Sequence, residues 1–547
     1  MYAKFPSLWV RKLTGKPAFL TIAGSESEAR RIHLIYGDDL LLCAAESKAF
    51  RIYSDLFCFP IAVLITRSSS GGTKLALNFL RAFIEKIIVA RHARRHDALT
   101  NFIIMNHELL HLNRRRFLKT SAAMAAASTL PKWFVQECEA RSKQSRVLSP
   151  NEQPAIALIG CGGQGRGDAK NASRLGRVVA VCDVDESHIA EAKKMFPDAT
   201  GYKDFRKVME RDDIHVVICG TVDHWHTLVS LAAMRSGKDV YCEKPLTLTI
   251  EDGKQLVRAV QKTKRVLQTG SQQRSNKDFR LACEMVRNGR IGKLQHLTTI
   301  LPGGMREGPF QTAPVPQGLD WDFWQGPTEN VDYKKQRCHF WFRYWYEYSG
   351  GTLTDWGAHH NDIALWGSGF ERSGPVSVEA KALSEPIPGG YSAIADYKID
   401  YTYANGLTHT CESTRDNSLT GGVVNPNGKL HGTRFEGTDG WIWITRGKIE
   451  ASRPEILTEP LSSKAERLYA SDDHMGNFFD CIRSRKQPIC EAEIGHRSAS
   501  ICHLGAIALR LGRKLTWDPK AEKFVNDKEA SKFLERKMRK PWSYDSV

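Results

Sequence analysis

Residues 155–165 read AIALIGCGGQG, a short apolar run that leads directly into closely spaced glycines. Five consecutive apolar residues predict a buried strand, and the Gly-x-Gly-x-x-Gly pattern after them predicts a turn that opens a helix. Gly160 would permit the tight turn, Gly162 would let a pyrophosphate approach the backbone, and Gly165 would let the helix pack closely. The stretch therefore predicts a dinucleotide-binding strand, turn and helix.

The same alternation continues to residue 269. Further apolar runs occur at 178–182, 214–219, 239–242 and 266–269, and helical stretches such as 224–235 and 250–263 separate them. Apolar runs that alternate with helices indicate a parallel sheet that is covered on both faces. We predict an α/β fold in which a Rossmann-type, doubly wound parallel sheet occupies residues 154–275.

Beyond about residue 290 the pattern becomes β-rich. Asn405-Gly406 is a pair typical of a type I′ hairpin turn, and Arg446-Gly447 marks a second hairpin. A helix from about residue 495 to 511 would place apolar side chains on one face. Residues 276–547 are therefore predicted to form an α+β domain with a large, mostly antiparallel open sheet, which would bind substrate and form oligomers.

The cofactor class follows from the end of the second predicted strand. Asp183 lies there, where a carboxylate would accept hydrogen bonds from the ribose hydroxyls. No arginine follows immediately to receive a 2′-phosphate, so NAD is favoured over NADP. We expect the glycine-rich part of the site to comprise Gly160, Gly162, Gly163, Gln164 and Gly165.

Two further motifs accompany the glycine-rich loop. Residues 242–245 read CEKP after the fourth predicted strand, and residues 350–362 read GGTLTDWGAHHND at the start of a predicted helix. Together these motifs resemble the signatures of the Gfo/Idh/MocA oxidoreductases (glucose-fructose oxidoreductase, inositol dehydrogenase), and the resemblance runs from about residue 154 to the closing RKPW at 539–542. It implies an NAD(H)-dependent enzyme that passes a hydride between a sugar or polyol carbon and the nicotinamide.

The two motifs contain three candidate catalytic residues: Lys244, Asp355 and His359. Lys244 follows the carboxyl end of a parallel strand, where an open sheet holds its ligand, and it could stabilise a developing alkoxide. Asp355 and His359 are four residues apart, so one turn of helix would aim both side chains into one cleft. Histidine titrates near neutrality. The resemblance assigns His359 as the acid/base, with Lys244 and Asp355 orienting the substrate and tuning the proton transfer.

More cofactor neighbours follow from the resemblance. Residues 221–226 read TVDHWH, which is similar to the family's cofactor-lining T-P-x-x-x-H segment, with Val222 where proline is usual. The resemblance therefore places Thr221 and His226 beside the cofactor. Glu243 of the CEKP motif is expected there too.

The motifs say less about which residues bind the substrate. Gln272 and Arg274 follow the fifth predicted strand and are expected to reach the cleft, and Asp362 would share the helical face of His359 and hold that ring or a substrate hydroxyl. The aromatic run at 339–346 fits stacking on a sugar ring and core packing equally well.

Two other functions stay open. Relatives with this fold support NAD-dependent, redox-assisted glycoside hydrolysis, in which transient oxidation acidifies a C–H bond, elimination releases the aglycone and reduction restores the cofactor. A non-catalytic sugar-binding protein of the same fold is the other class. Lys244, Asp355 and His359 argue against it, because binding alone needs no acid/base. The resemblance also implies a homodimer or homotetramer.

The front of the chain carries a different signal. Residues 113–119 read NRRRFLK, which resembles a twin-arginine motif with Asn113 where serine or threonine is usual, and a weakly apolar stretch follows at 120–130. We interpret residues 105–135 as an export signal and expect the twin-arginine machinery as a partner. No run in the chain reaches the roughly 18 apolar residues of a spanning helix, so no stable membrane span is expected.

An export signal in this position predicts where translation begins and where the protein is delivered. Export signals act at the amino terminus, so translation would begin at Met105 and residues 1–104 would be an over-extended gene model; a real extension is the alternative. Residues 136–153 read as a polar linker. The expected location is the periplasm, with an uncleaved signal as an anchor in one version, and the cytoplasm if the signal is misread. Because free NAD is scarce outside the cytoplasm, we expect tight cofactor retention.

Charge and cysteine content exclude two other classes. The net charge is +17 at pH 7, but the excess of lysine and arginine lies mostly before residue 150, so no nucleic-acid-binding face is indicated. The 13 cysteines form no C-x-x-C pair and no Cys/His cluster at zinc spacing. Asp355, His359 and Asp362 also lack a further cysteine or histidine at ligand spacing. We therefore expect no metal site.

Overall fold

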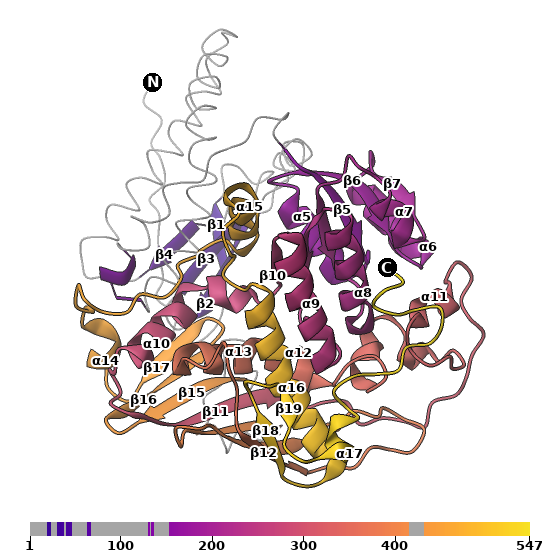
Figure 1. The fold of residues 1–547 in the computed structure, drawn as a ribbon. Helices are drawn as coiled ribbons and strands as arrows, with labels where there is room; N and C mark the ends of the chain where they lie inside the picture. The colour runs from indigo at the N-terminus through magenta and orange to yellow at the C-terminus, as the bar shows by residue number, and fades with distance from the viewer. Residues whose placement is uncertain are drawn as a thin grey trace, which may run out of the picture. The chain divides into compact units, whose positions relative to one another are not determined.

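The computed structural model describes residues 130–131, 133–135, 153–414 and 431–547, together with four strands near the amino terminus (Figure 1). Residues 1–118 and 119–547 form two compact units. The first unit contains an antiparallel sheet in the order β1-β2-β3-β4, with bounds β1 (Phe19–Ile22), β2 (Arg30–Gly37), β3 (Leu40–Ala45) and β4 (Val63–Thr66). The arginine motif, most of the predicted signal and most of the predicted linker lie outside the described residues.

The second unit begins with the predicted parallel sheet. Its six strands run in the order β10-β9-β8-β5-β6-β7, and every neighbouring pair is parallel. The order turns back at β5, so the carboxyl ends of β5 and β8 flank a switch point where open α/β sheets bind ligands. The strands are β5 (Ala155–Ile159), β6 (Arg177–Cys182), β7 (Thr200–Tyr202), β8 (Val216–Cys219), β9 (Asp239–Cys242) and β10 (Leu267–Thr269).

Both faces of this sheet are covered, as the apolar runs predicted. Along β5, Ile156 and Leu158 belong to one buried cluster, whereas Ala157 and Ile159 belong to another on the opposite face. Successive strand residues point to opposite faces, so a strand buried on both sides must be apolar throughout. The covering helices are α5 (Gly163–Ala172), α6 (Glu186–Met195), α7 (Phe205–Met209), α8 (Asp223–Arg235) and α9 (Ile250–Thr263).

Residues from the end of the chain also cover the parallel sheet. Helix α15 (His474–Ser484) places Met475, Phe478 and Phe479 in the cluster of Ile156 and Leu158. The chain after residue 537 packs on the other cluster, where Trp542 lies against the rings of the α7–α8 side. The faces of the sheet formed by residues 154–275 are therefore partly covered by segments from the second half of the chain.

The second sheet is large and mostly antiparallel, which confirms the predicted fold class. Its nine strands run in the order β17-β16-β15-β11-β14-β13-β12-β18-β19, and only β11 and β14 pair in parallel among these described strands. The strands are β11 (Leu294–Pro302), β12 (Ser377–Ala382), β13 (Tyr397–Thr402), β14 (Thr408–Thr414), β15 (Gly432–Gly437), β16 (Gly440–Thr445), β17 (Lys448–Ala451), β18 (Leu515–Asp518) and β19 (Lys523–Phe524).

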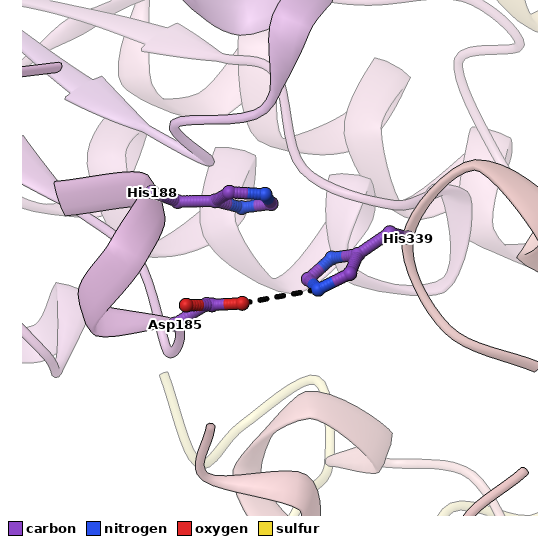
Figure 2. Close-up of side chains that lie close together, drawn as sticks. All are labelled: Asp185, His188 and His339. Atoms are coloured by element: carbon purple, nitrogen blue, oxygen red, sulfur yellow. Dashed lines mark ion pairs between the residues drawn. The ribbon is translucent and has the colours of Figure 1, made fainter. Parts of the chain in front are cut away.

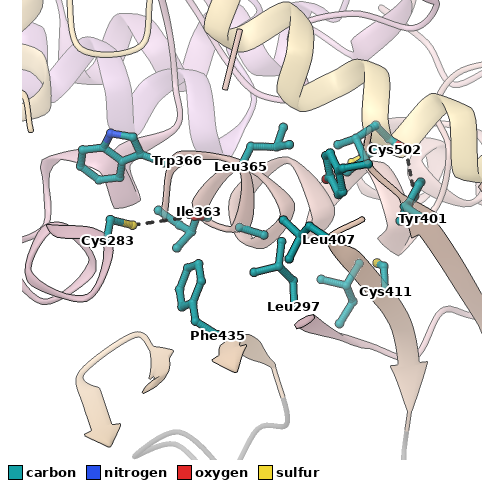
Figure 3. Packing of buried hydrophobic residues seen from close by; sticks show 14 of the residues in the cluster. Cys283, Leu297, Ile363, Leu365, Trp366, Tyr401, Leu407, Cys411, Phe435 and Cys502 are labelled. Carbon is teal, nitrogen blue, oxygen red and sulfur yellow. Dashed lines mark hydrogen bonds between the residues drawn. The ribbon is translucent and has the colours of Figure 1, made fainter. Parts of the chain in front are cut away.

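One face of this sheet packs under helices and forms the largest buried core (Figure 3). Along β13, Tyr397, Ile399 and Tyr401 are buried while Lys398 and Asp400 between them are exposed, which is the alternation of a sheet covered on one face. The covering helices are α10 (Lys277–Arg287), α13 (Gly357–Ser368) and α16 (Ala492–Leu511). The remaining described helices are short: η2 (Gln272–Ser275), α11 (Trp321–Gln325), η3 (Lys335–Arg337), η4 (His339–Tyr344), α12 (Thr352–Asp355), α14 (Glu455–Thr458) and α17 (Lys528–Ser531).

The hairpin between β13 and β14 corrects one local prediction. Gly406 has φ 85°, but Asn405 does not have a positive φ. A type I′ turn needs positive φ at both central residues, so the type I′ prediction is wrong although the hairpin exists. Gly406 N–H instead donates to Tyr403 O at 3.0 Å, and the loop places its left-handed residue at Gly406.

In the part of the chain that the structure describes, no helix is long and apolar enough to cross a bilayer.

The junction of α5 with β5 yields a stability prediction with a matched control. A Cβ atom at Gly165 would lie 2.1 Å from Gly160 O, whereas a Cβ atom at Gly167 of the same helix would meet nothing within 4 Å. We expect Gly165→Ala to destabilise the fold by about 1–3 kcal/mol through overpacking. Gly167→Ala should be neutral or stabilise it by up to about 1 kcal/mol. Thermal and denaturant unfolding of both variants tests this, and equal stability of the two would contradict the close helix packing.

Candidate active site

The glycine-rich turn presents open backbone at the switch point of the parallel sheet. Gly160 has φ 88°, and a Cβ atom there would lie 2.5 Å from the backbone of Gly220. Cβ atoms at Gly162 or Gly163 would meet nothing within 4 Å. Helix α5 begins with Gly162 as its N-cap and has no side-chain cap. Its first amides therefore face an unobstructed cradle that suits a pyrophosphate.

A cleft of about 420 Å³ runs along the carboxyl ends of β5, β6, β8 and β9. Nearly all the residues that we predicted for the cofactor line it: Gly160, Gly162, Gly163, Gln164, Asp183, Thr221, His226, Glu243 and Lys244. Gly165 is not part of the lining, because its role is the close approach of α5 to β5. The dimensions and lining fit a dinucleotide that lies across the end of the sheet.

Hydrogen bonds hold the carboxylate of Asp183 in place beside this cleft. Its Oδ2 atom accepts a hydrogen bond from Cys161 N at 2.6 Å, and its Oδ1 atom accepts one from Asp185 N at 3.0 Å. The Nδ1 atom of His188 lies 3.3 Å from Oδ2. These contacts fix the carboxylate where β6 ends, while part of it stays open to the cleft.

Lys244 and Asp355 form an ion pair inside the cleft. The Lys244 Nζ atom lies 2.5 Å from Asp355 Oδ1, and Arg343 Nε lies 3.5 Å from Asp355 Oδ2. Burial raises the pKa of Asp355, but the Lys244 and Arg343 cations outweigh it and hold the pKa below its usual value. Asp355 is therefore ionised at neutral pH and fixes the ammonium group of Lys244. This pair links the loop after β9 to α12.

The backbone around His359 differs from the single helical turn that we expected. Helix α12 ends at Asp355 and α13 begins at Gly357, so the helix is interrupted at Trp356, between Asp355 and His359 in the sequence. His359 is only 5% exposed, and its Nδ1 atom has no hydrogen-bond partner within the described chain. Burial and then the Lys244 cation hold the pKa of His359 well below its usual range. His359 is therefore a neutral imidazole.

Arg274 and Asp362 bind each other, which differs from the substrate contacts that we predicted for them. Arg274 Nε donates to Asp362 Oδ2 at 2.7 Å and Arg274 Nη2 donates to Oδ1 at 2.8 Å, with both side chains buried. Ser498 of α16 also donates to Asp362. Neither residue lines the cleft. A bidentate buried pair outside the cleft lining is closed to a sugar hydroxyl, so its place in the fold is structural.

Gln272 lies outside the cleft lining and His226 lies within it, and both contact other residues of the site. The Gln272 Nε2 atom donates to Glu243 Oε1 at 3.0 Å, so this side chain positions Glu243. The His226 ring lies between two carbonyl oxygens, with Nδ1 at 2.8 Å from Pro245 O and Nε2 at 3.2 Å from Thr221 O. His226 thus connects the loops that follow β8 and β9.

Sequence reasoning missed a buried carboxyl group in the cleft. Asp223, at the start of α8, lines the cleft, and its Oδ2 atom accepts a hydrogen bond from Ser349 Oγ at 2.5 Å. Burial raises the pKa of Asp223 to about 7. Asp223 stands just beyond the carboxyl end of the parallel strand β8, and this position could have indicated it. The prediction instead chose Thr221 and His226 of the same segment.

The aromatic run at 339–346 divides between the two roles considered for it. Phe340 and Phe342 line the cleft, and so does Arg343. Trp345 is buried and packs against Tyr391, with ring centroids 5.8 Å apart. Part of the run thus closes the cleft and part belongs to the core.

Comparisons with known proteins agree with this architecture. Residues 155–271 match the profile described as "Oxidoreductase family, NAD-binding Rossmann fold", and residues 305–544 match "Oxidoreductase family, C-terminal alpha/beta domain". Residues 111–131 match the twin-arginine translocation pathway signal sequence.

Similar curated proteins include two enzyme types. A glycosyl hydrolase family 109 protein of Shewanella pealeana is 28% identical over 204 residues, which cover 34% of this chain and 45% of that protein. A myo-inositol 2-dehydrogenase of Thermotoga maritima is 30% identical over 140 residues, covering 25% of this chain and 42% of that protein. The chain thus spans less than half the length of these curated relatives.

Solved structures share the fold at low identity. The WlbA dehydrogenase of Bordetella pertussis, in complex with NADH and UDP-GlcNAcA, is 17% identical with a TM-score of 0.50, covering 67% of this chain and 99% of that one. A levoglucosan dehydrogenase in complex with NADH and L-sorbose is 18% identical with a TM-score of 0.50, covering 66% and 98%. With both profiles matched in order and the NAD cleft formed at the switch point, the chain belongs to the Gfo/Idh/MocA family of NAD-binding oxidoreductases.

Proposed function

We propose that this chain is an NAD-dependent dehydrogenase that acts on a CH–OH group of a sugar or polyol. The observation that carries the proposal is the Lys244–Asp355 pair, 2.5 Å apart inside the NAD cleft, together with the neutral imidazole of His359 four residues further on. An ammonium group, an ionised carboxylate and a neutral base are what hydroxyl oxidation requires at one end of a dinucleotide site.

Each residue has a defined task in this proposal. The Nζ atom of Lys244 donates a hydrogen bond to the substrate hydroxyl oxygen and stabilises the negative charge that develops on it. The imidazole of His359 accepts the hydroxyl proton. Asp355 holds Lys244 in place through their ion pair. NAD, when bound, supplies the acceptor for the hydride of the substrate carbon.

The proposed substrate class draws on the cleft and on the relatives. Phe340 and Phe342 give the cleft aromatic surface, which suits the apolar face of a sugar ring. Levoglucosan dehydrogenase and myo-inositol 2-dehydrogenase are named for polyhydroxylated ring substrates. The chain itself has the donors and acceptors for such a ring in Arg343, Asp223 and Lys244.

Redox-assisted glycoside hydrolysis is the second candidate. It is favoured by the relatives named glycosyl hydrolase family 109 protein and by an alpha-N-acetylgalactosaminidase of Shewanella oneidensis, which is 26% identical over 209 residues. The same three residues serve that reaction, because it begins with oxidation of a ring hydroxyl. The products separate the two activities, since hydrolysis gives bond cleavage without net NADH.

We also propose that the protein is exported and retains its cofactor. The match of residues 111–131 to the twin-arginine signal supports periplasmic delivery of an already folded protein. Folding before export lets the cleft carry NAD with it. The proposed assembly is a homodimer or homotetramer that uses the uncovered face of the second sheet.

A direct experiment tests the proposed function. The protein is expressed from Met105, purified without added nucleotide and denatured to identify any released dinucleotide, and NADH absorbance is followed against a panel of sugars and glycosides. Bound NAD with NADH formation supports the dehydrogenase. Glycoside cleavage without net NADH supports the hydrolase, and the absence of both nucleotide and turnover contradicts the proposal.

Removal of the Lys244 ammonium group should abolish most turnover. We expect Lys244→Met to lower kcat by about 10²–10³-fold, because it removes the donor that stabilises the developing alkoxide, while NAD binding is retained. Lys262→Met, on the exposed side of α9, is the matched control and should leave kcat unchanged. Steady-state kinetics and nucleotide titration check this, and a Lys244→Met enzyme within threefold of wild-type kcat would refute the assigned role.

The pH profile tests the state of His359. Because burial and Lys244 hold its pKa well below the usual 6.5, the ring stays neutral as pH falls, and kcat/KM should show no histidine limb between pH 8 and 6. Asp223, whose pKa is about 7, is replaced in Asp223→Asn so that its own titration drops out. His359→Asn in that background should lower kcat by about 10²–10⁴-fold. A limb near pH 6.5 in Asp223→Asn would argue against a neutral His359.

A further inference from the structure

A second cluster of polar side chains lies beside Asp183 along the same cleft. Asp185 and His188 come from the start of α6, and His339 reaches toward them from the start of η4 (Figure 2). One ligand atom from each residue lies within 4.8 Å of the others. Asp185 Oδ2 and His339 Nε2 are 3.0 Å apart, and the two imidazole rings have centroids 4.4 Å apart. Two imidazoles and one carboxylate are a donor set that Zn²⁺ and similar first-row cations prefer.

Neighbouring groups orient these donors as they do around known metal ions. The Nδ1 atom of His188 lies 3.3 Å from Asp183 Oδ2, so a proton on Nδ1 leaves the Nε2 lone pair for a ligand. A carboxylate behind a histidine is the usual support of a metal ligand. Asp185 Oδ1 accepts hydrogen bonds from Ser187 N at 2.8 Å and Ser187 Oγ at 2.6 Å. Its Oδ2 atom is thereby left to face His339.

The backbone also aims His339 at the cluster. His339 has φ 50°, a left-handed conformation that residues other than glycine or asparagine rarely adopt. The segment that precedes it ends at Cys338, which is buried in a separate aromatic core. The left-handed residue turns the chain there, so the imidazole points back toward α6 while the following residues enter η4.

The start of α6 is already held from one side by another loop, at residues 318–320. Glu186 N–H donates to Gly318 O at 3.0 Å and Asp320 N–H donates to Val184 O at 3.0 Å, so residues 318–320 pair with the loop between β6 and α6. His188 and His339 also line the cleft beside Asp183, where the adenosine ribose is expected. An ion held by all three donors would pin the 335–344 segment to α6 on the other side.

We propose that Asp185, His188 and His339 bind one Zn²⁺ or similar first-row divalent cation, and that the ion fastens the 335–344 segment over the adenosine end of the cleft. Three protein ligands leave one coordination position for water. The ion slows release of the dinucleotide, and this consequence rests on the proposed NAD-dependent function. The ion site itself depends only on the three side chains.

Metal binding can be measured without turnover. The full chain from Met105 carries no histidine tag, is stripped with a chelator and is titrated with Co²⁺ as a spectroscopic probe, followed by Zn²⁺ competition. We expect one equivalent bound, with a visible Co²⁺ band. His339→Ala should weaken Zn²⁺ binding by at least about tenfold. His296→Ala, a histidine on β11 that contacts Thr408, is the matched control and should bind as wild type.

The possible results distinguish binding of the ion from its proposed effect on dinucleotide release. Equal Zn²⁺ affinity in wild type and His339→Ala overturns the site; Asp185→Asn, which keeps the side-chain size, gives the same comparison if His339→Ala folds poorly. Dissociation of NADH is then followed by its fluorescence with and without Zn²⁺. We expect Zn²⁺ to slow release several-fold in wild type and not in His339→Ala, and equal rates overturn the fastening role. Absence of sugar oxidation with Zn²⁺ still bound would count against the proposed function and not against the ion site.

Discussion

The contact of α5 with the end of β5 is the constraint on which the rest of the active unit depends. Gly165 approaches the Gly160 carbonyl so closely that a Cβ atom would lie 2.1 Å from it, and Gly220 of the next loop fills the space beside both. Three glycines therefore allow three backbones to meet without side chains between them. This contact sets the direction of α5, and with it the direction of the amides that face the cleft.

The residues proposed for catalysis are brought together by packing between the two halves of the second unit. Lys244 comes from the loop after β9, whereas Asp355 comes from α12, and they meet at 2.5 Å. Helix α16 lies between these parts. It packs so tightly on α9 that a Cβ atom at Gly253 would lie 1.9 Å from His496, and a Cβ atom at Gly357 of α13 would lie 2.8 Å from the Cys502 sulfur. A displacement of α16 would therefore move Lys244 relative to Asp355.

Burial separates the charged groups of this unit into two kinds. Arg274 and Asp362 compensate each other completely and are closed to solvent, so they hold η2 to α13. Asp355 is ionised beside two cations, while His359 stays neutral because the same positive charge and burial oppose its protonation. The NAD cleft is thus lined by the ionised Asp355 and by His188 and His339, whereas the neutral His359 is buried and is not part of the lining.

Local sequence determined the elements and the cofactor class. Strand β5, strand β9 and helix α9 have the predicted bounds, because buried strands need unbroken apolar runs and Thr249 caps the helix. Gly160, Gly162 and Asp183 could be placed in the nucleotide site because each acts through its own backbone or the end of its own strand. The type I′ turn was wrong, because Asn405 does not have a positive φ. The helix that was expected to carry both Asp355 and His359 is interrupted at Trp356, which lies between α12 and α13.

Tertiary structure alone decided which distant residues meet. Arg274 and Asp362 looked like substrate ligands because each stands near a motif, but nothing in the local sequence reveals that they face each other. Helix α15 covers part of one face of the parallel sheet, although it lies far from those strands in the sequence. His339 joins Asp185 and His188 for the same reason: a spacing rule sees only ligands that are close in sequence, whereas a donor cluster forms wherever the packing of distant segments brings the atoms within reach.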